Sequence, residues 1–83
     1  MEAKIKIKKT LHADNNKTFR VDDDIYFELT ETGDKYIGRI KKIKKKSIII
    51  DNIEINGNPA GIAPMKIKLE DIKPYSCQYL SVD

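Results

Sequence analysis

Residues 21–51 of the chain read VDDDIYFELTETGDKYIGRIKKIKKKSIIID. Apolar and polar side chains alternate over residues 25–30, which is the period of a half-buried β-strand. Gly33 permits the positive φ of a short hairpin loop. Strands are expected over 36–43 and 47–51, separated by a tip of lysines. The stretch therefore predicts two consecutive β-hairpins, around which the rest of the chain folds.

The register of the first hairpin has two solutions. A two-residue loop at Thr32-Gly33 places Phe27 opposite Gly38, whereas a three-residue loop that ends at Gly33 places Phe27 opposite Ile37. We favour the first, because a glycine in the middle of a strand needs a covering ring or a sharp bend. A bend at that glycine also lets a small sheet curl.

Composition predicts one domain, 1–83, with a thin core, since 40% of the 83 residues are apolar and 35% are charged. No stretch approaches the roughly 20 apolar residues of a membrane span. The first residues lack the apolar run of a signal peptide. Cys77 is the only cysteine, which excludes an intrachain disulfide. We therefore expect a cytoplasmic protein.

Further short strands follow the same alternation on both sides of the central stretch. They are 1–11, a lysine-studded edge strand with Ile5, Ile7 and Leu11 inward, then 18–21, 53–55, 65–69 and 72–75. Residues 56–61 are expected to be a loop, because Asn, Gly and Pro cluster there. The tail, 76–83, either docks through Tyr79, Leu80 and Val82 or frays.

These elements predict an all-β fold, a small barrel of five to six strands with one short helical turn near residues 69–72. The barrel core is expected to cover about residues 18–75. Phe27 and Ile50 are expected in the hydrophobic core. Met65, Ile67 and Leu69 are expected to point inward from the last long strand.

Three segments resemble a known family: Tyr36-x-Gly38-x-Ile40-x-x-Ile43, Ile48-x-Ile50 and Ile67-x-Leu69-x-Asp71-Ile72. They look like the core pattern of SH3-like small barrels and are most similar to the Sm-like and YolD-like groups. The resemblance covers residues 25–75 and implies a closed or half-closed barrel. Sm-like RNA binders place acidic and amide residues after the bent strand to hold a base. This chain has Lys44-Lys45-Lys46-Ser47 there.

Charge is segregated along the central stretch. Residues 22–34 contain six acids and no base, and residues 35–46 contain seven bases and no acid. If the two segments pair as a hairpin, acid faces base across the ladder, and each such pair contributes roughly 0.2–1 kcal/mol. Much of the basic charge is then neutralised by its neighbour, while the lysines at the tip stay free to meet phosphates.

The tip supports one functional hypothesis, sequence-independent binding of DNA or RNA. Cations for phosphates and aromatic rings for stacking on bases make up the expected site. These residues are Arg39, Lys41, Lys42, Lys44, Lys45, Lys46, Tyr26 and Tyr36. The alternative is a protein-interaction module or accessory subunit that pairs or self-associates through its strand edges, with no role in nucleic-acid binding.

An enzyme is not expected from this sequence. The only histidine, His12, lies in a polar turn, and Cys77 has no partner nearby in the sequence, so a catalytic constellation is lacking. Asp22, Asp23 and Asp24 alternate between faces in an extended chain and do not converge on a metal ion. We therefore expect a non-enzymatic binding module without metal or cofactor.

Overall fold

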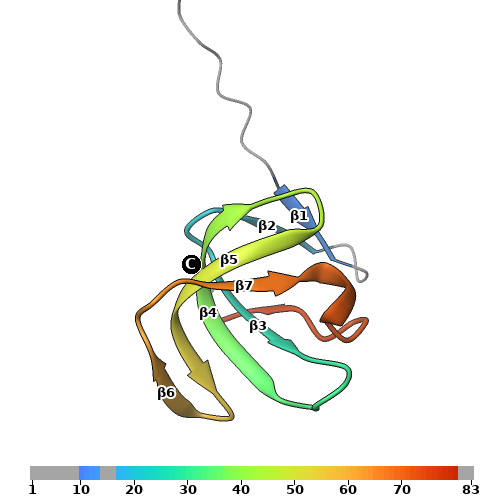
Figure 1. Cartoon of the computed structure of the whole chain (residues 1–83). Coiled ribbons are helices and arrows are strands. Elements are labelled where there is room, and N and C mark those ends of the chain that lie inside the picture. The colour runs from blue at the N-terminus through green and yellow to red at the C-terminus, as the bar shows by residue number, and fades with distance from the viewer. Residues whose placement is uncertain (1–9, 14–16, 81–83) are drawn as a thin grey trace, which may run out of the picture.

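The structure, a computed structural model, describes residues 10–13 and 17–80. Eight short strands and one 3-10 turn make up this part of the chain (Figure 1). They are β1 Thr10–His12, β2 Thr18–Arg20, β3 Asp24–Glu28, β4 Lys35–Ile43, β5 Ser47–Ile55, β6 Asn58–Gly61, β7 Met65–Lys68, η1 Leu69–Asp71 and β8 Gln78–Tyr79. All strand pairs are antiparallel. The prediction of an all-β fold with one short helical turn is confirmed.

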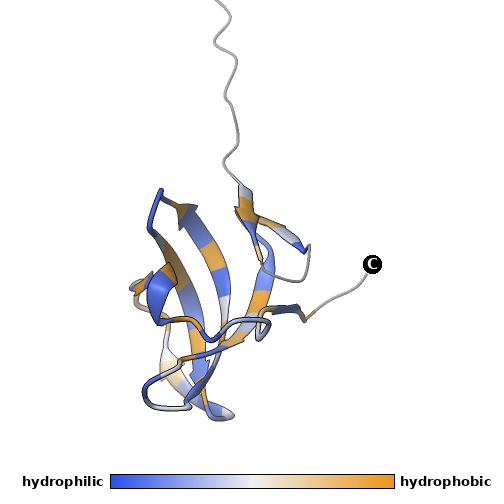
Figure 2. Ribbon diagram, turned by 90° about the vertical axis from the view of Figure 1, so that its right-hand side faces the viewer, coloured by the Kyte–Doolittle hydropathy of each residue, from blue (hydrophilic) through white to orange (hydrophobic). Residues whose placement is uncertain are grey.

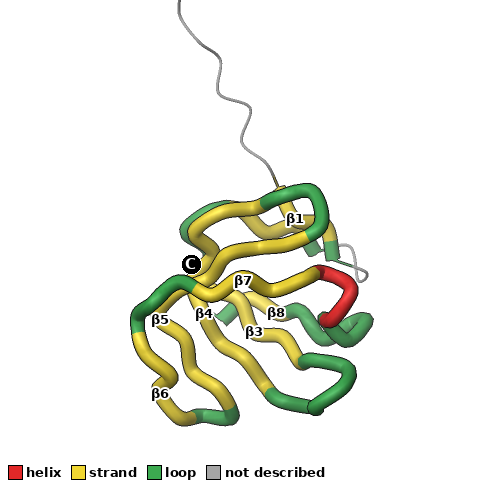
Figure 3. Tube along the Cα trace, viewed as in Figure 1, coloured by secondary structure: helices red, strands yellow, loops and turns green. Residues whose placement is uncertain are grey.

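The strands form a curled sheet and a separate two-stranded one, not a closed barrel (Figure 3). The curled sheet has the order β6-β5-β4-β3-β8, with β7 also paired to β5, while β1 and β2 pair with each other. Between β7 and β8, the chain forms an isolated bridge with the end of β3, Leu29 with Ile72, and β7 itself does not pair with β3. The expected five- to six-stranded barrel is therefore wrong in strand number and in closure.

β3 and β4 form the first hairpin, with Phe27 opposite Tyr36. The N–H of Leu29 donates to the carbonyl of Asp34 at 3.0 Å, so the loop that this hydrogen bond closes has four residues, 30–33. Both registers expected from the sequence are therefore wrong. The reason is that Gly33, with φ of 71°, is the last of four loop residues rather than of two or three.

β5 packs closely against the backbone of β4 at Gly38. The register between the two strands shifts next to it, and Asn52 takes the left-handed φ of 50° in the bulged β5. A Cβ atom at Gly38 would lie 3.0 Å from Cδ1 of Ile50 and 3.2 Å from the carbonyl oxygen of Asp51. The absence of a side chain is thus what allows this packing.

Gly38→Val is expected to destabilise the protein by about 1–3 kcal/mol, because the added side chain overpacks the contact with Ile50. Urea unfolding followed by circular dichroism measures the change. Lys35→Val, which puts the same side chain on an exposed position of β4, is the matched control and should change stability by less than about 0.5 kcal/mol. Equal effects of both variants would contradict the role given to Gly38.

Aliphatic and aromatic side chains from the alternating strands form the core. Figure 2 shows hydrophobic and hydrophilic residues following one another along these strands. The largest fully buried side chains are Phe19, Phe27, Ile25, Ile40, Ile48 and Ile50. The expected burial of Phe27, Ile50 and Ile67 is confirmed. Met65 is exposed, against expectation, because it begins β7 directly after an exposed segment, and Leu69 is only partly buried.

β6 corrects the expectation of a loop over residues 56–61. Asn56 and Gly57 both have positive φ, 53° and 83°. This is the two-residue hairpin turn that an Asn-Gly pair favours, so the chain returns along β5 as a strand. Pro59 is tolerated because β6 lies at the edge of the sheet.

The two ends of the described chain meet at Phe19. Leu11 lies opposite Phe19 in the β1–β2 register, and both are buried. β8 pairs with β3, and the ring of Tyr79 lies 4.2 Å from that of Phe19 between centroids. The tail is thus docked as far as Leu80. Residues 1–9 of the edge strand expected over 1–11, with Ile5 and Ile7, lie outside the described residues, as does Val82.

Candidate functional site

The β4–β5 hairpin ends in a tight turn that presents lysines to solvent. The N–H of Lys44 donates to the carbonyl of Ser47 at 2.8 Å and closes the turn. Lys44, Lys45 and Lys46 are all exposed. The N–H of Leu69 donates to the carbonyl of Lys46 at 2.9 Å, which fixes η1 against the tip.

β7 brings two further lysines to this tip. In its register with β5, Lys68 lies opposite Ser47 and Lys66 lies opposite Ile49. Residues two apart in a strand point to the same face, and both lysines are exposed. Sequence reasoning missed them as site residues, because the pairing of β5 with β7 leaves no local signal.

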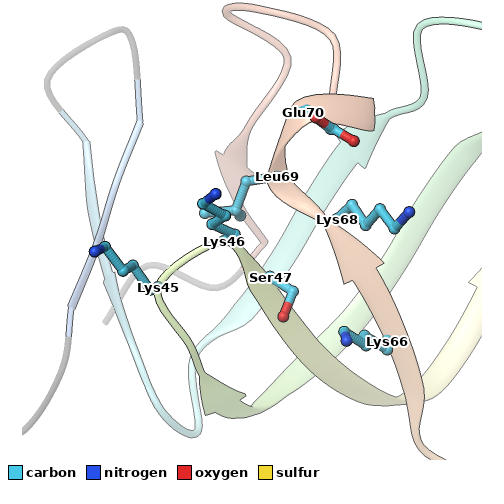
Figure 4. A pocket seen from close by; sticks show the side chains of 7 residues that line it. All are labelled: Lys45, Lys46, Ser47, Lys66, Lys68, Leu69 and Glu70. Carbon is cyan, nitrogen blue, oxygen red and sulfur yellow. The ribbon is translucent and has the colours of Figure 1, made fainter.

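These two segments line a cleft of about 500 Å³ (Figure 4). Its lining residues are Lys45, Lys46, Ser47, Lys66, Lys68, Leu69 and Glu70. The hairpin tip forms one wall, and β7 with η1 forms the other. Four lysines against one glutamate give the cleft a net positive charge, so it suits an anion.

Ser47 adds a neutral polar group to the cleft. The residue is only 4% exposed, yet it lines the cleft. Within the described residues its hydroxyl makes no hydrogen bond. Figure 4 shows this hydroxyl between the side chains of Lys46 and Lys66. A hydroxyl both donates and accepts, so it offers an anion one donor beside the ammonium groups.

The cleft lysines are not neutralised by acids of the described chain. The ion pairs between residues of this part are Arg39–Asp24 at 3.3 Å, Lys41–Asp51 at 3.8 Å and Lys73–Glu28 at 3.7 Å. Cross-strand pairing between the acidic and basic arms is thus confirmed at Arg39. Lys41 is paired as well, but with an acid of β5. Arg39 and Lys41 thus each form an ion pair, whereas the three lysines of the tip form none within the described chain.

The two tyrosines expected at the site lie elsewhere. Tyr36 is buried and stacks on Phe27, with ring centroids 5.6 Å apart and planes 13° apart, so the expectation that it stacks on a base is wrong. Tyr26 lies on the outer side of β3, opposite Ile37, and its hydroxyl donates to the carboxylate of Glu28 at 3.0 Å. Neither ring lines the cleft.

Partial burial of Tyr26, with the hydrogen bond to Glu28 and the negative charge of that residue, raises the pKa of the tyrosine hydroxyl above its ordinary 10.0. The protonated hydroxyl therefore stabilises the fold below pH 10, and this contribution is lost as the pH rises through the raised pKa. Tyr26→Phe has no hydroxyl at this position and so does not titrate there. The stability advantage of the native protein over Tyr26→Phe is expected to stay constant well below pH 10 and to fall as the pH rises from about 10 through the raised pKa of Tyr26. Urea unfolding of both proteins at each pH measures it, and a constant difference would contradict this prediction.

Lys44 and Lys42, the remaining candidate residues, do not line this cleft. Lys44 lines a second cleft together with Lys45. Lys42 is exposed on β4, opposite Ile49. The structure thus brings together Lys44, Lys45 and Lys46 of the expected set and adds the two lysines of β7.

Histidine, cysteine and acidic side chains in residues 10–13 and 17–80 do not gather into a metal-ligating group. No group of three His, Cys, Asp or Glu side chains there could hold a metal ion. The ring of His12 is within hydrogen-bonding distance of the hydroxyls of Thr10 and Thr18, at 3.2 Å and 3.4 Å, and Cys77 is buried. Among the same residues, no helix has the length and apolar character needed to cross a membrane.

Comparison with known proteins gives no match among protein-family models, curated proteins or solved structures. Neither a family nor a structural neighbour therefore bears on the resemblance to SH3-like barrels. The chemistry of the cleft is the basis for a functional assignment.

Proposed function

We propose that this protein is a non-enzymatic module that binds the phosphate backbone of nucleic acid in the lysine-lined cleft. The observation that carries the proposal is that Lys45, Lys46, Lys66 and Lys68 all line one cleft, and that none of them forms an ion pair with an acid of the described chain. Charged N–H groups on phosphate oxygens form short, strong hydrogen bonds.

A polyanion suits this cleft better than a single small anion. Four ammonium groups around one cleft repel one another, so a ligand with several negative charges relieves the repulsion at each. Lysine acts on phosphate as a point charge on a flexible stem. Such contacts give affinity and orientation without reading the base sequence. We therefore expect sequence-independent binding, and a cytoplasmic location gives access to both DNA and RNA.

An SH3-like assignment of the fold belongs to the same proposal. The close approach at Gly38 within the β4–β5 pair and the 3-10 turn at Leu69–Asp71 support it. The open ring of strands departs from the closed barrel that the resemblance implies.

Fluorescence anisotropy with labelled oligonucleotides of mixed sequence tests the proposal. The logarithm of the affinity should fall with the logarithm of salt concentration with a slope of about −0.7 per phosphate contact on a single strand, or −0.9 on a duplex. Three contacts on a single strand therefore predict a loss of about tenfold when salt rises threefold. Absence of binding at low salt, or binding that ignores salt, would contradict it.

A second candidate function, self-association, is favoured by a separate surface. Residues 56–66 are all exposed, and residues 55–65 carry no charge in a chain that is 35% charged. Ile62 is 79% exposed within this surface, and β6 forms an open sheet edge. Open edges accept strands from other chains. A sedimentation coefficient that rises with protein concentration would support this candidate, and one that stays constant would exclude it.

A further inference from the structure

The lysine-lined cleft continues into two others at the same end of the molecule. The second, of about 520 Å³, shares Lys45 and Leu69 with the first. The third, of about 140 Å³, shares Leu69, Leu11 and His12 with the second. Leu69 lines all three, so the clefts adjoin one another at its side chain, and together they are called the groove below.

The character of this groove changes along its length. The first cleft is lined mainly by lysines. The third is lined mainly by apolar side chains, Leu11, Leu69 and Ile72 among them, together with His12 and Tyr75. Lys44 lines the second cleft and Lys73 the third, so a cation accompanies the apolar surface throughout. The groove thus offers positive charge and apolar or aromatic contacts side by side.

Tyr75 stands in the third cleft in an unfavourable backbone conformation. The N–H of Ser76 donates to the carbonyl of Lys73 at 3.2 Å, so Pro74 and Tyr75 are the central residues of a β-turn. Tyr75 has φ of 64°, which this turn position reserves for glycine or asparagine and which bulky side chains rarely adopt. The Tyr75 residue is 71% exposed, so burial of the ring does not offset the strain.

The turn is held in place by Ser76. The N–H of Glu28 donates to its hydroxyl at 3.1 Å, and the hydroxyl donates to the carbonyl of Lys73 at 2.6 Å. These bonds tie the turn to β3 and fix the backbone position from which Tyr75 projects. Strained residues that the surrounding structure holds in place are typical of positions that contact a ligand. Tyr75 fits this description, because its side chain is largely exposed and does not contribute to the core.

We infer that Tyr75 stacks on an unpaired base and that the ligand of the groove is single-stranded nucleic acid. This inference rests on the proposed function. A single strand exposes base faces that an aromatic ring covers, and such stacking is indifferent to sequence. A duplex covers its base faces internally and leaves the apolar end of the groove unused. Phosphates at the lysines and a base at Tyr75 together match the charge and the apolar surface of the groove.

Tyr75→Gly tests both the backbone strain at this residue and the stacking of its ring on a base. Glycine takes the positive φ without strain, so the variant should unfold at a higher urea concentration than the native protein. Loss of the ring should lower the affinity for a single-stranded oligonucleotide about fivefold or more. Affinity for a duplex of the same sequence should not change. Tyr75→Phe keeps the ring and should match the native protein in both measurements.

The outcomes distinguish the inference from the proposed function. Unchanged single-strand affinity of Tyr75→Gly, or a duplex bound by the native protein as tightly as the single strand, overturns the inference and leaves the proposed function standing. A Tyr75→Gly variant that is no more stable than the native protein overturns the claim of strain. Native protein that binds neither oligonucleotide at low salt overturns the proposed function itself.

Discussion

Truncation of Phe27 or Ile50 to alanine is expected to destabilise the protein by about 2–5 kcal/mol each. Both side chains are fully buried. Phe27 stacks on Tyr36, and Ile50 packs on the bare backbone of Gly38. Each truncation removes apolar contact and leaves a cavity that the strands around it cannot close without moving.

Urea unfolding followed by circular dichroism measures this loss. A domain of this size has a stability of order 5–15 kcal/mol at most, so either variant loses a large part of it. Ile62→Ala removes a side chain of the same kind as Ile50 from a position that is 79% exposed, and should cost less than about 0.5 kcal/mol. A loss below about 1 kcal/mol at both core sites would mean that the core has been assigned to the wrong side chains.

Removal of two lysines from the cleft is expected to weaken nucleic-acid binding at least about 150-fold, since each charge-assisted contact is worth about 1.5 kcal/mol or more. The variant is Lys46→Gln with Lys68→Gln, one lysine from each wall. The salt dependence should weaken too, by about 0.7 in slope for each lost contact with a single strand.

The matched control is Lys35→Gln with Lys42→Gln, which changes the net charge equally at exposed positions of β4 that do not line the cleft. Long-range attraction alone predicts the same small loss for both double variants. A control that loses as much affinity as the cleft variant would show that binding follows net charge and not this cleft. Urea unfolding of both checks that the folds are intact.

β3 and β4 were predictable because each alternates over a length that a half-buried strand explains. β3 and β4 differ from the expected segments by one or two residues at their ends. The register was not predictable, because Gly33 fits a loop of two, three or four residues equally well. Tyr36 was misplaced although its alternation with Gly38 and Ile40 puts it on the buried face.

β6 carried a local signal that its neighbours obscured. Asn56-Gly57 is the strongest short hairpin signal known, but Pro59 and Gly61 beside it favour a loop. An edge strand tolerates both residues, and a sequence does not reveal which strand lies at an edge. β8 gave no periodic signal, because two residues are too few to show one.

Only the hairpin-tip wall of the candidate site was predictable from the sequence. A run of lysines between two strands marks Lys44, Lys45 and Lys46 as a hairpin tip. Lys66 and Lys68 join them through the pairing of β5 with β7, which connects residues far apart in the chain. Local patterns carry no information about such pairings. The strained turn that presents Tyr75 likewise depends on hydrogen bonds to distant β3.

Mapping of the bound surface by amide chemical shifts tests the central claim most directly. A protein of 9.5 kDa gives well-resolved amide spectra, and a single-stranded oligonucleotide of mixed sequence is added stepwise at low salt. The account predicts that the largest shifts fall on residues 44–47 and 66–70, the two walls of the cleft. Shifts confined to the outer side of β3 and β4 around Tyr26 and Arg39, or no shifts at all, would contradict it.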